Sequence, residues 1–166
     1  MDLKKLVREM SGKNRCDLTQ LFADPDALQH LIKALARPFR DANIDKVVAL
    51  EAIGFVLASG VALELEAGLV LIRKQGKIAW TTRSVEFTDY TKKTKQFEIA
   101  DDAILPGDKI LIVDDWTETG AQLKAAISLV EQMDGIVSGI SCLNVDPQAK
   151  NDKTLSNYRM HSVIEY

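Results

Sequence analysis

The chain has 166 residues, of which 46% are hydrophobic and 27% charged, and its formal net charge is −3. This composition predicts one globular domain with a sizeable buried core. The acidic balance gives no support for bulk attraction to nucleic acid or to a membrane surface, and no apolar run reaches the ~20 residues that span a bilayer. Nucleic acid and membranes are therefore excluded from the expected partners.

The first third of the chain is expected to be helical. Asp24 is a suitable N-cap with Pro25 at the first helical position. Apolar residues then recur at helical spacing, at Leu28, Leu31, Ile32 and Leu35.

The N-terminus leads into no secretory signal. The two cysteines, Cys16 and Cys142, are too few for a disulfide framework, and both features favour a cytoplasmic location.

The middle of the chain alternates between strand and helix patterns. Residues 46–50 and 69–72 are short apolar runs typical of buried parallel strands, and a helix is expected between them, over 54–65. The threonine-rich stretch 78–99 is expected to form β-structure around a mobile loop. A strand at 110–113, a helix at 123–132 and strands at 136–143 and 160–164 complete the pattern. This alternation predicts an α/β fold, with a mostly parallel twisted sheet flanked by helices.

One stretch points to chemistry. Four aliphatic residues, 110–113, are followed at once by Asp114 and Asp115, then by a short polar turn containing Thr119-Gly120 and an apolar helix. Acids at the carboxyl end of a parallel strand project into the crevice where such sheets bind ligands. Backbone N–H groups at the start of the next helix form an anion site. Carboxylates beside a phosphate cradle indicate a sugar phosphate ligand.

The same stretch resembles the phosphoribosyl pyrophosphate (PRPP) motif of the type I phosphoribosyltransferases. Three further segments resemble the adenine branch of that family, in the same order along the chain. They are Arg15-Cys16-Asp17-Leu18-Thr19 with the following Asp24-Pro25, Glu51-Ala52-Ile53-Gly54-Phe55, and Arg73-Lys74-Gln75-Gly76-Lys77.

The resemblance implies a single domain, with a small N-terminal hood over about 1–42 and a core over about 43–166. It implies transfer of the 5-phosphoribosyl group from PRPP to a purine, with adenine favoured and pyrophosphate released, in purine salvage. PRPP and the purine are then the small-molecule partners, Mg²⁺ the cofactor and a homodimer the expected assembly. A xanthine or hypoxanthine enzyme and a non-catalytic PRPP- or nucleotide-binding regulator are the alternatives.

By the same resemblance, Asp114 and Asp115 hold the ribose hydroxyls and Mg²⁺, directly or through water. The rest of the PRPP-binding loop is Thr117, Glu118, Thr119, Gly120, Ala121 and Gln122. Pyrophosphate is assigned to Glu51 and Ala52, joined by a cis peptide bond, and to the cations Arg73, Lys74 and Lys77. The purine is assigned to Arg15, Cys16 and Ile53.

The chain departs from the adenine pattern at several of these positions. Ile53 stands where the family has arginine, and an aliphatic side chain cannot replace a guanidinium. Ala121 and Gln122 replace a glycine and a threonine, and the hood lacks its stacking aromatic residue. These differences are what a non-catalytic regulator would also show.

Two acids are candidates for proton transfer at the purine. Glu86 lies in Val85-Glu86-Phe87, which resembles the Leu-Glu-Tyr of the adenine family's flexible catalytic loop. The nearby segment 90–94 instead resembles bacterial xanthine phosphoribosyltransferases, and the sequence does not decide between the two alignments. Glu118 occupies the position at which the hypoxanthine-guanine branch has a catalytic aspartate.

Overall fold

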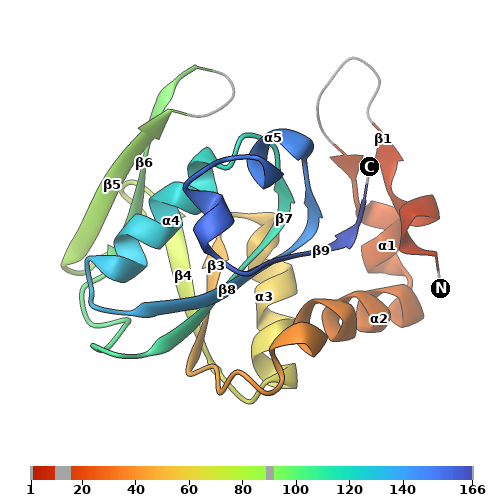
Figure 1. Cartoon of the computed structure of the whole chain (residues 1–166), viewed down its shortest axis with the longest axis horizontal. Helices are drawn as coiled ribbons and strands as arrows, with labels where there is room; N and C mark the ends of the chain where they lie inside the picture. Colours follow the sequence, from red (N-terminus) through yellow and green to blue (C-terminus); the bar gives the residue numbers. More distant parts are fainter. Residues whose placement is uncertain (1, 10–15, 89–91, 166) are drawn as a thin grey trace.

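The computed structural model describes residues 2–9, 16–88 and 92–165. Its central parallel strands are β3 (Lys46–Leu50), β4 (Gly68–Lys74), β7 (Lys109–Thr117), β8 (Ile136–Val145) and β9 (Met160–Ile164). An antiparallel hairpin of β5 (Thr82–Thr88) and β6 (Thr94–Ala100) joins the edge of β4. Within the described ranges these form a seven-stranded sheet in the order β5-β6-β4-β3-β7-β8-β9 (Figure 1). The expected α/β fold with a mostly parallel sheet is confirmed.

Helices cover both faces of the central strands (Figure 1). The helices α2 (Pro25–Ala36) and α3 (Ile53–Glu64) lie on one face, and α4 (Ala121–Glu131) lies on the other. Helix α2 begins as expected, because the Asp24 side chain accepts a 2.9 Å hydrogen bond from the Ala27 N–H. None of the helices in the described ranges has the length and apolarity to cross a membrane.

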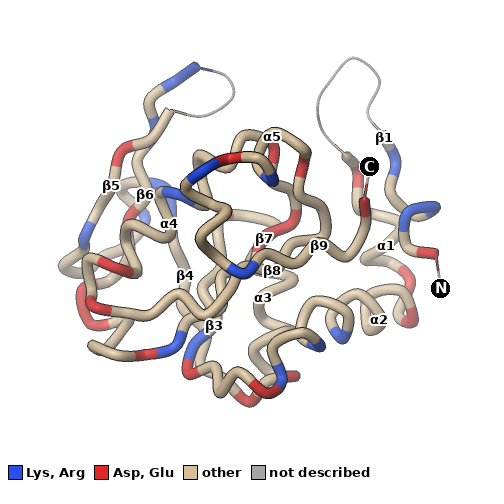
Figure 2. The backbone as a smooth tube through the Cα atoms, viewed as in Figure 1, with Lys and Arg blue, Asp and Glu red and all other residues tan. Residues whose placement is uncertain are grey.

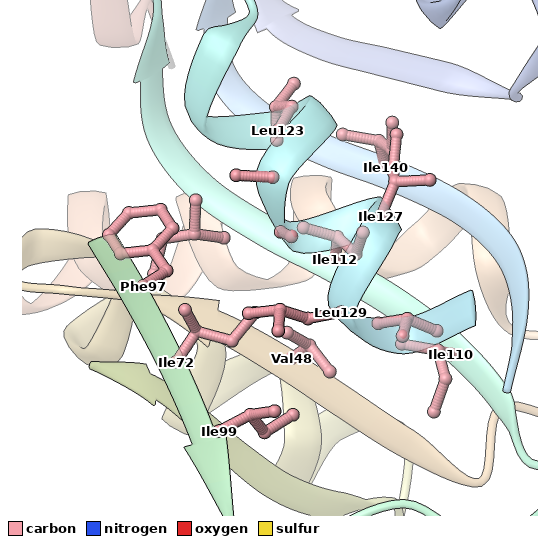
Figure 3. Packing of buried hydrophobic residues seen from close by; sticks show 14 of the residues in the cluster. Val48, Ile72, Phe97, Ile99, Ile110, Ile112, Leu123, Ile127, Leu129 and Ile140 are labelled. Atoms are coloured by element: carbon pink, nitrogen blue, oxygen red, sulfur yellow. The ribbon is translucent and has the colours of Figure 1, made fainter. Parts of the chain in front are cut away.

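The two faces of the sheet have separate cores because successive strand residues point to opposite faces. On β3, Val47 and Ala49 pack under α2 and α3, whereas Val48 and Leu50 pack toward α4. Figure 3 shows the α4 side, where Val48 lies among residues of β4, β6, β7 and α4. Burial on both faces explains why β3 and β7 contain unbroken aliphatic runs, at 47–50 and 110–113.

The N-terminal region differs from the expected all-helical segment. It contains a 3₁₀ helix (Leu3–Leu6), α1 (Thr19–Ala23) and a small antiparallel pair, β1 (Arg8–Glu9) with β2 (Cys16–Asp17). Two-residue strands carry too few positions for a periodic pattern and exist only through their pairing. The remaining short elements are 3₁₀ helices at Arg37–Phe39 and Leu155–Asn157, and α5 (Pro147–Lys150).

Figure 2 shows acidic and basic residues interspersed along the backbone.

Candidate active site

The site lies where parallel strands end. Strands β3 and β7 are neighbours, and Val48 pairs with Ile112. Glu51 directly follows the end of β3, whereas β7 does not stop at residue 113 as expected but continues to Thr117, so Asp114 and Asp115 lie within the strand, beside the end of β3. Pairing of β7 with β8 extends the strand past the aliphatic run. A cleft of about 310 Å³ opens there. Its walls include Cys16, Leu18, Glu51, Ala52, Ile53, Lys74, Phe87, Lys95, Phe97 and every residue from Asp114 to Gln122. The carboxyl edge of a parallel sheet is where open α/β folds bind ligands.

The two adjacent carboxylates are held in a desolvated environment. Asp114 is 6% exposed, and its Oδ1 accepts a 3.0 Å hydrogen bond from the Asp115 N–H. Burial, with the neighbouring charge of Asp115, raises the pKa of Asp114 well above its ordinary value. Burial also raises the pKa of Asp115. A ligand that supplies hydroxyl donors or positive charge would relieve this repulsion.

The turn after β7 leads directly into α4. Gly120 adopts a left-handed conformation, with φ of 77°, and a Cβ built on it would stand 2.4 Å from Leu155 Cδ1. Glycine is therefore required here on two counts. The Thr119 hydroxyl accepts a 3.3 Å hydrogen bond from the Ala121 N–H. The first N–H groups of a helix have no intrahelical acceptor and suit a phosphate, and the residues from Thr117 to Gln122 all line the cleft.

Glu51 is the centre of a cationic cluster. The Glu51–Ala52 peptide bond is cis, as expected. Glu51 Oε2 accepts hydrogen bonds of 3.0 Å from Arg73 Nε and from the Lys74 N–H, and its Oε1 pairs with Lys77 Nζ. Burial alone would raise the pKa of Glu51, but these donors lower it to about 2. Among the expected pyrophosphate cations, Lys74 lines the cleft, whereas Arg73 and Lys77 contact Glu51 and line a second hollow.

Apolar side chains also line the cleft. Cys16 and Leu18 from the N-terminal segment line it, together with Ile53, which is 38% exposed, and Trp116. The Trp116 indole N–H donates a 3.1 Å hydrogen bond to Asp146 Oδ1, which also accepts a 2.7 Å bond from Asn144 Nδ2. These contacts fix the indole ring at the wall. The expected purine residue Arg15 lies outside the described residues.

The two candidate acids are placed differently. Glu118 lines the cleft. Glu86 is exposed on β5, on the opposite face from Phe87, which lines the cleft. The structure therefore does not bring Glu86 together with the other expected residues, because strand alternation turns it away. Residues 90 and 91, from the segment with the second alignment, lie outside the described residues.

Sequence reasoning missed five residues of the cleft wall, which are Leu18, Phe87, Lys95, Phe97 and Trp116. Lys95 and Phe87 are cross-strand partners in the β5–β6 hairpin, a pairing that no local pattern reveals. Trp116 could have been found, since it stands directly after the two acids of the motif. An aromatic residue at that point suits a flat base.

The donors in the site fit Mg²⁺ only in part. Across residues 2–9, 16–88 and 92–165, no group of three or more histidine, cysteine or acidic side chains gathers in a way that could hold a metal. Asp114 and Asp115 offer hard oxygen ligands, and Mg²⁺ is commonly held by one or two carboxylates with substrate phosphates and water. The residues therefore fit a Mg²⁺ ion that arrives with a phosphorylated substrate.

This fold and this site define a class of protein. The model of the phosphoribosyl transferase domain matches residues 17–164, and the chain belongs to that family. It is an enzyme of the phosphoribosyltransferase class with the type I fold.

The relatives narrow the class further. The chain is 40% identical to an adenine phosphoribosyltransferase of Kosmotoga olearia, over the full length of both chains. It is also similar to the crystal structure of adenine phosphoribosyltransferase from Rhodothermus marinus, with a TM-score of 0.91, 34% identity and coverage of 99% and 96% of the two chains. The Saccharomyces cerevisiae enzyme, solved with adenine and an imino-altritol bisphosphate, gives a TM-score of 0.87 at 27% identity, with coverage of 98% and 97%.

Proposed function

We propose that this protein transfers the 5-phosphoribosyl group from PRPP to a ring nitrogen of adenine and releases pyrophosphate, as a step of purine salvage. The observation that carries the proposal is the single cleft in which the acid pair, the phosphate loop and the Glu51–Ala52 turn meet. Full-length similarity to adenine phosphoribosyltransferases supports adenine as the base.

The phosphoribosyl group would be fixed at two points. Asp114 and Asp115 would accept hydrogen bonds from the ribose hydroxyls, and the amides from Thr117 to Gln122 would bind the 5′-phosphate. Holding both ends of the sugar places its anomeric carbon between base and leaving group, and such positioning can supply several kcal/mol (roughly 7–11 at most) of the barrier reduction. Asp114 and Asp115 would hold a Mg²⁺ ion that arrives with PRPP, and the ion would supply charge neutralisation for the leaving pyrophosphate.

Pyrophosphate would leave toward the Glu51–Ala52 turn. Lys74 and Lys95 both line the cleft and would stabilise the charge that develops on the leaving group. Arg73 and Lys77 are assigned a supporting part, since they contact Glu51 rather than the cleft.

The purine would lie against the apolar side chains of the cleft wall, which include Cys16 and Leu18 of the N-terminal hood. Trp116 would stack on one face of the ring, with Cys16, Leu18 and Ile53 around it. Arg15 stays assigned to the purine by the family resemblance alone. Glu118 is the favoured residue for moving the proton on the purine, because it lines the cleft. Glu86 could act only after a movement of the hairpin.

We assign a homodimer built on the uncovered face of β4. Parallel strands are normally covered on both faces, yet Leu69 and Leu71 are 41% and 36% exposed and border a second hollow of about 500 Å³. Val56 and Leu63 of α3 are also exposed. Light scattering of the wild type and of Leu71→Asp would test the assembly, since a monomeric wild type contradicts it.

The cytoplasmic location is supported by the state of the two cysteines, which are both free thiols.

The test is pyrophosphate release with PRPP and Mg²⁺, in separate reactions with adenine, hypoxanthine, guanine and xanthine. Release with adenine alone is expected. Release with xanthine or hypoxanthine alone would reassign the base. If PRPP raises the melting temperature and no base gives release, the protein is a PRPP-binding regulator and the proposed activity is wrong.

A further inference from the structure

A buried carboxylate outside the cleft organises the turn that carries Lys77. Glu98 of β6 is 6% exposed, and its side chain accepts three hydrogen bonds from consecutive backbone amides. The Gly76 N–H lies 3.0 Å from Oε2, and the N–H groups of Lys77 and Ile78 lie 2.7 and 2.9 Å from Oε1. Gly76 takes the left-handed conformation needed for the turn, with φ of 80°.

Three successive amides aimed at one point form a concave anion site of the kind that often binds phosphate. Here the Glu98 carboxylate is the anion, so the backbone N–H groups of this turn are already occupied and cannot bind pyrophosphate. The turn contributes to the site through its side chains instead. A buried charge with three donors is also a stiff arrangement, because losing any one of them leaves an ionised group poorly solvated.

The turn is connected to the cleft through Lys77. The Lys77 ammonium pairs with Glu51 Oε1, while Glu51 Oε2 accepts from Arg73 Nε and from the Lys74 N–H, each at 3.0 Å. Glu51 and Lys74 both line the cleft. Contacts therefore run without a break from Glu98, through the turn and Lys77, to Glu51 and Lys74.

We propose that Glu98 is a positioning residue for pyrophosphate binding, which acts by fixing the 76–78 turn and through it Lys77, Glu51 and Lys74. It would hold these groups in place before the substrate arrives, so that binding orders fewer side chains. The inference rests on the proposed function, because it assigns the pyrophosphate end of the cleft.

The variant to make is Glu98→Gln. Glutamine has nearly the same shape, but its NH₂ group faces a backbone donor and only one oxygen remains to accept. The matched control is Asp108→Asn. Asp108 accepts a 2.8 Å hydrogen bond from the Leu105 N–H and pairs with Lys46 at 2.7 Å, but it precedes β7 at the end of the sheet opposite the cleft.

Three quantities separate positioning from general stability: the KM for PRPP, the calorimetric Kd for Mg²⁺-pyrophosphate, and amide hydrogen exchange at Gly76, Lys77 and Ile78. In Glu98→Gln we expect faster exchange at these amides and an increase of about tenfold in both constants, which corresponds to one or two weakened hydrogen bonds. The KM for adenine should change less than about twofold. Asp108→Asn should lower the melting temperature and leave both constants unchanged.

The proposal is overturned if Glu98→Gln loses thermal stability to the same degree as the control and keeps both constants at wild-type values. It is also overturned if the KM for adenine rises as much as that for PRPP. If the wild type turns over no base, the proposed function fails, while the pyrophosphate Kd and the exchange rates still decide the part played by Glu98.

Discussion

Gly54 and Asp114 are in close contact across the start of α3 and the end of β7. A Cβ built on Gly54 would stand 3.0 Å from Asp114 Oδ1 and 3.2 Å from the Val113 carbonyl oxygen. The same Oδ1 accepts the hydrogen bond from the Asp115 N–H at 3.0 Å. The helix can therefore begin beside the acid pair only because this position lacks a side chain.

Gly54→Ala should displace the Asp114 carboxylate and reduce kcat/KM at least tenfold, or about 1.4 kcal/mol. Stability should change little, because alanine in a helix gains up to about 1 kcal/mol over glycine and this offsets part of the overlap. Gly60→Ala is the control on the same helix, since the three atoms nearest its Cβ would all belong to the Ile32 side chain, at 2.6–3.1 Å, and not to the acid pair. If both variants keep wild-type kcat/KM, Gly54 has no part in placing Asp114.

Asp115→Asn should stabilise the free protein at neutral pH while lowering activity. Burial raises the folded-state pKa of Asp115 above 3.8, so the ionised form is disfavoured by folding. Stability from a raised acid is present below the unfolded pKa and is lost as pH rises through the folded pKa. The variant should therefore melt roughly 2–4 °C higher than wild type at about pH 7, for about 1 kcal/mol gained, with the difference vanishing near about pH 4. Calorimetry across this range without PRPP is the measurement, and a lower melting temperature at neutral pH would contradict it.

Lys95→Met should raise the KM for PRPP about tenfold by removing a charge-assisted contact to the leaving group. Methionine keeps most of the apolar stem beside Phe87, its cross-strand partner, so the hairpin should stay folded. Lys109→Met, an exposed lysine at the far end of β7, controls for net charge. An equal rise in the KM for PRPP in both variants would mean that Lys95 acts only through the net charge of the protein.

Trp116→Leu should raise the KM for adenine by more than that for PRPP, because loss of ring stacking is worth about 1 kcal/mol. Fluorescence gives a direct readout. Trp80 is 70% exposed and is the chain's other tryptophan, so Trp80→Phe leaves Trp116 as the sole emitter. Adenine should quench its emission. No quenching at saturating adenine would place the base elsewhere.

Glu118→Gln should lower kcat about 10²–10⁴-fold and remove one limb of the pH–rate profile, as expected for loss of a general acid or base. Glu86→Gln should keep most of its kcat, since Glu86 is exposed on the outer face of β5. If Glu86→Gln is the inactive variant instead, the hairpin must reorient during the reaction. Full turnover in both would show that neither residue transfers the proton.

The sequence by itself determined the α/β fold and the aliphatic strand that leads into the acid pair, although β7 continues through the acids to Thr117. Unbroken aliphatic runs at β3 and β7 arise because both faces of these strands are buried, and this is visible residue by residue. The turn at 118–120, between β7 and α4, is equally local, because glycine and a helix start are specified within a few positions. The cis peptide at Glu51 followed only from the family resemblance.

Tertiary structure decided which charged side chains reach the cleft. Strand alternation turned Glu86 outward and brought Lys95 and Phe87 inward, and the register that fixes this depends on pairing between β5 and β6. Arg73 and Lys77 stand one and three positions from Lys74, yet only Lys74 lines the cleft, because Glu51 holds the other two. Local sequence records which charges are present, but their directions depend on distant partners, such as Glu51 for Lys77, 26 residues away.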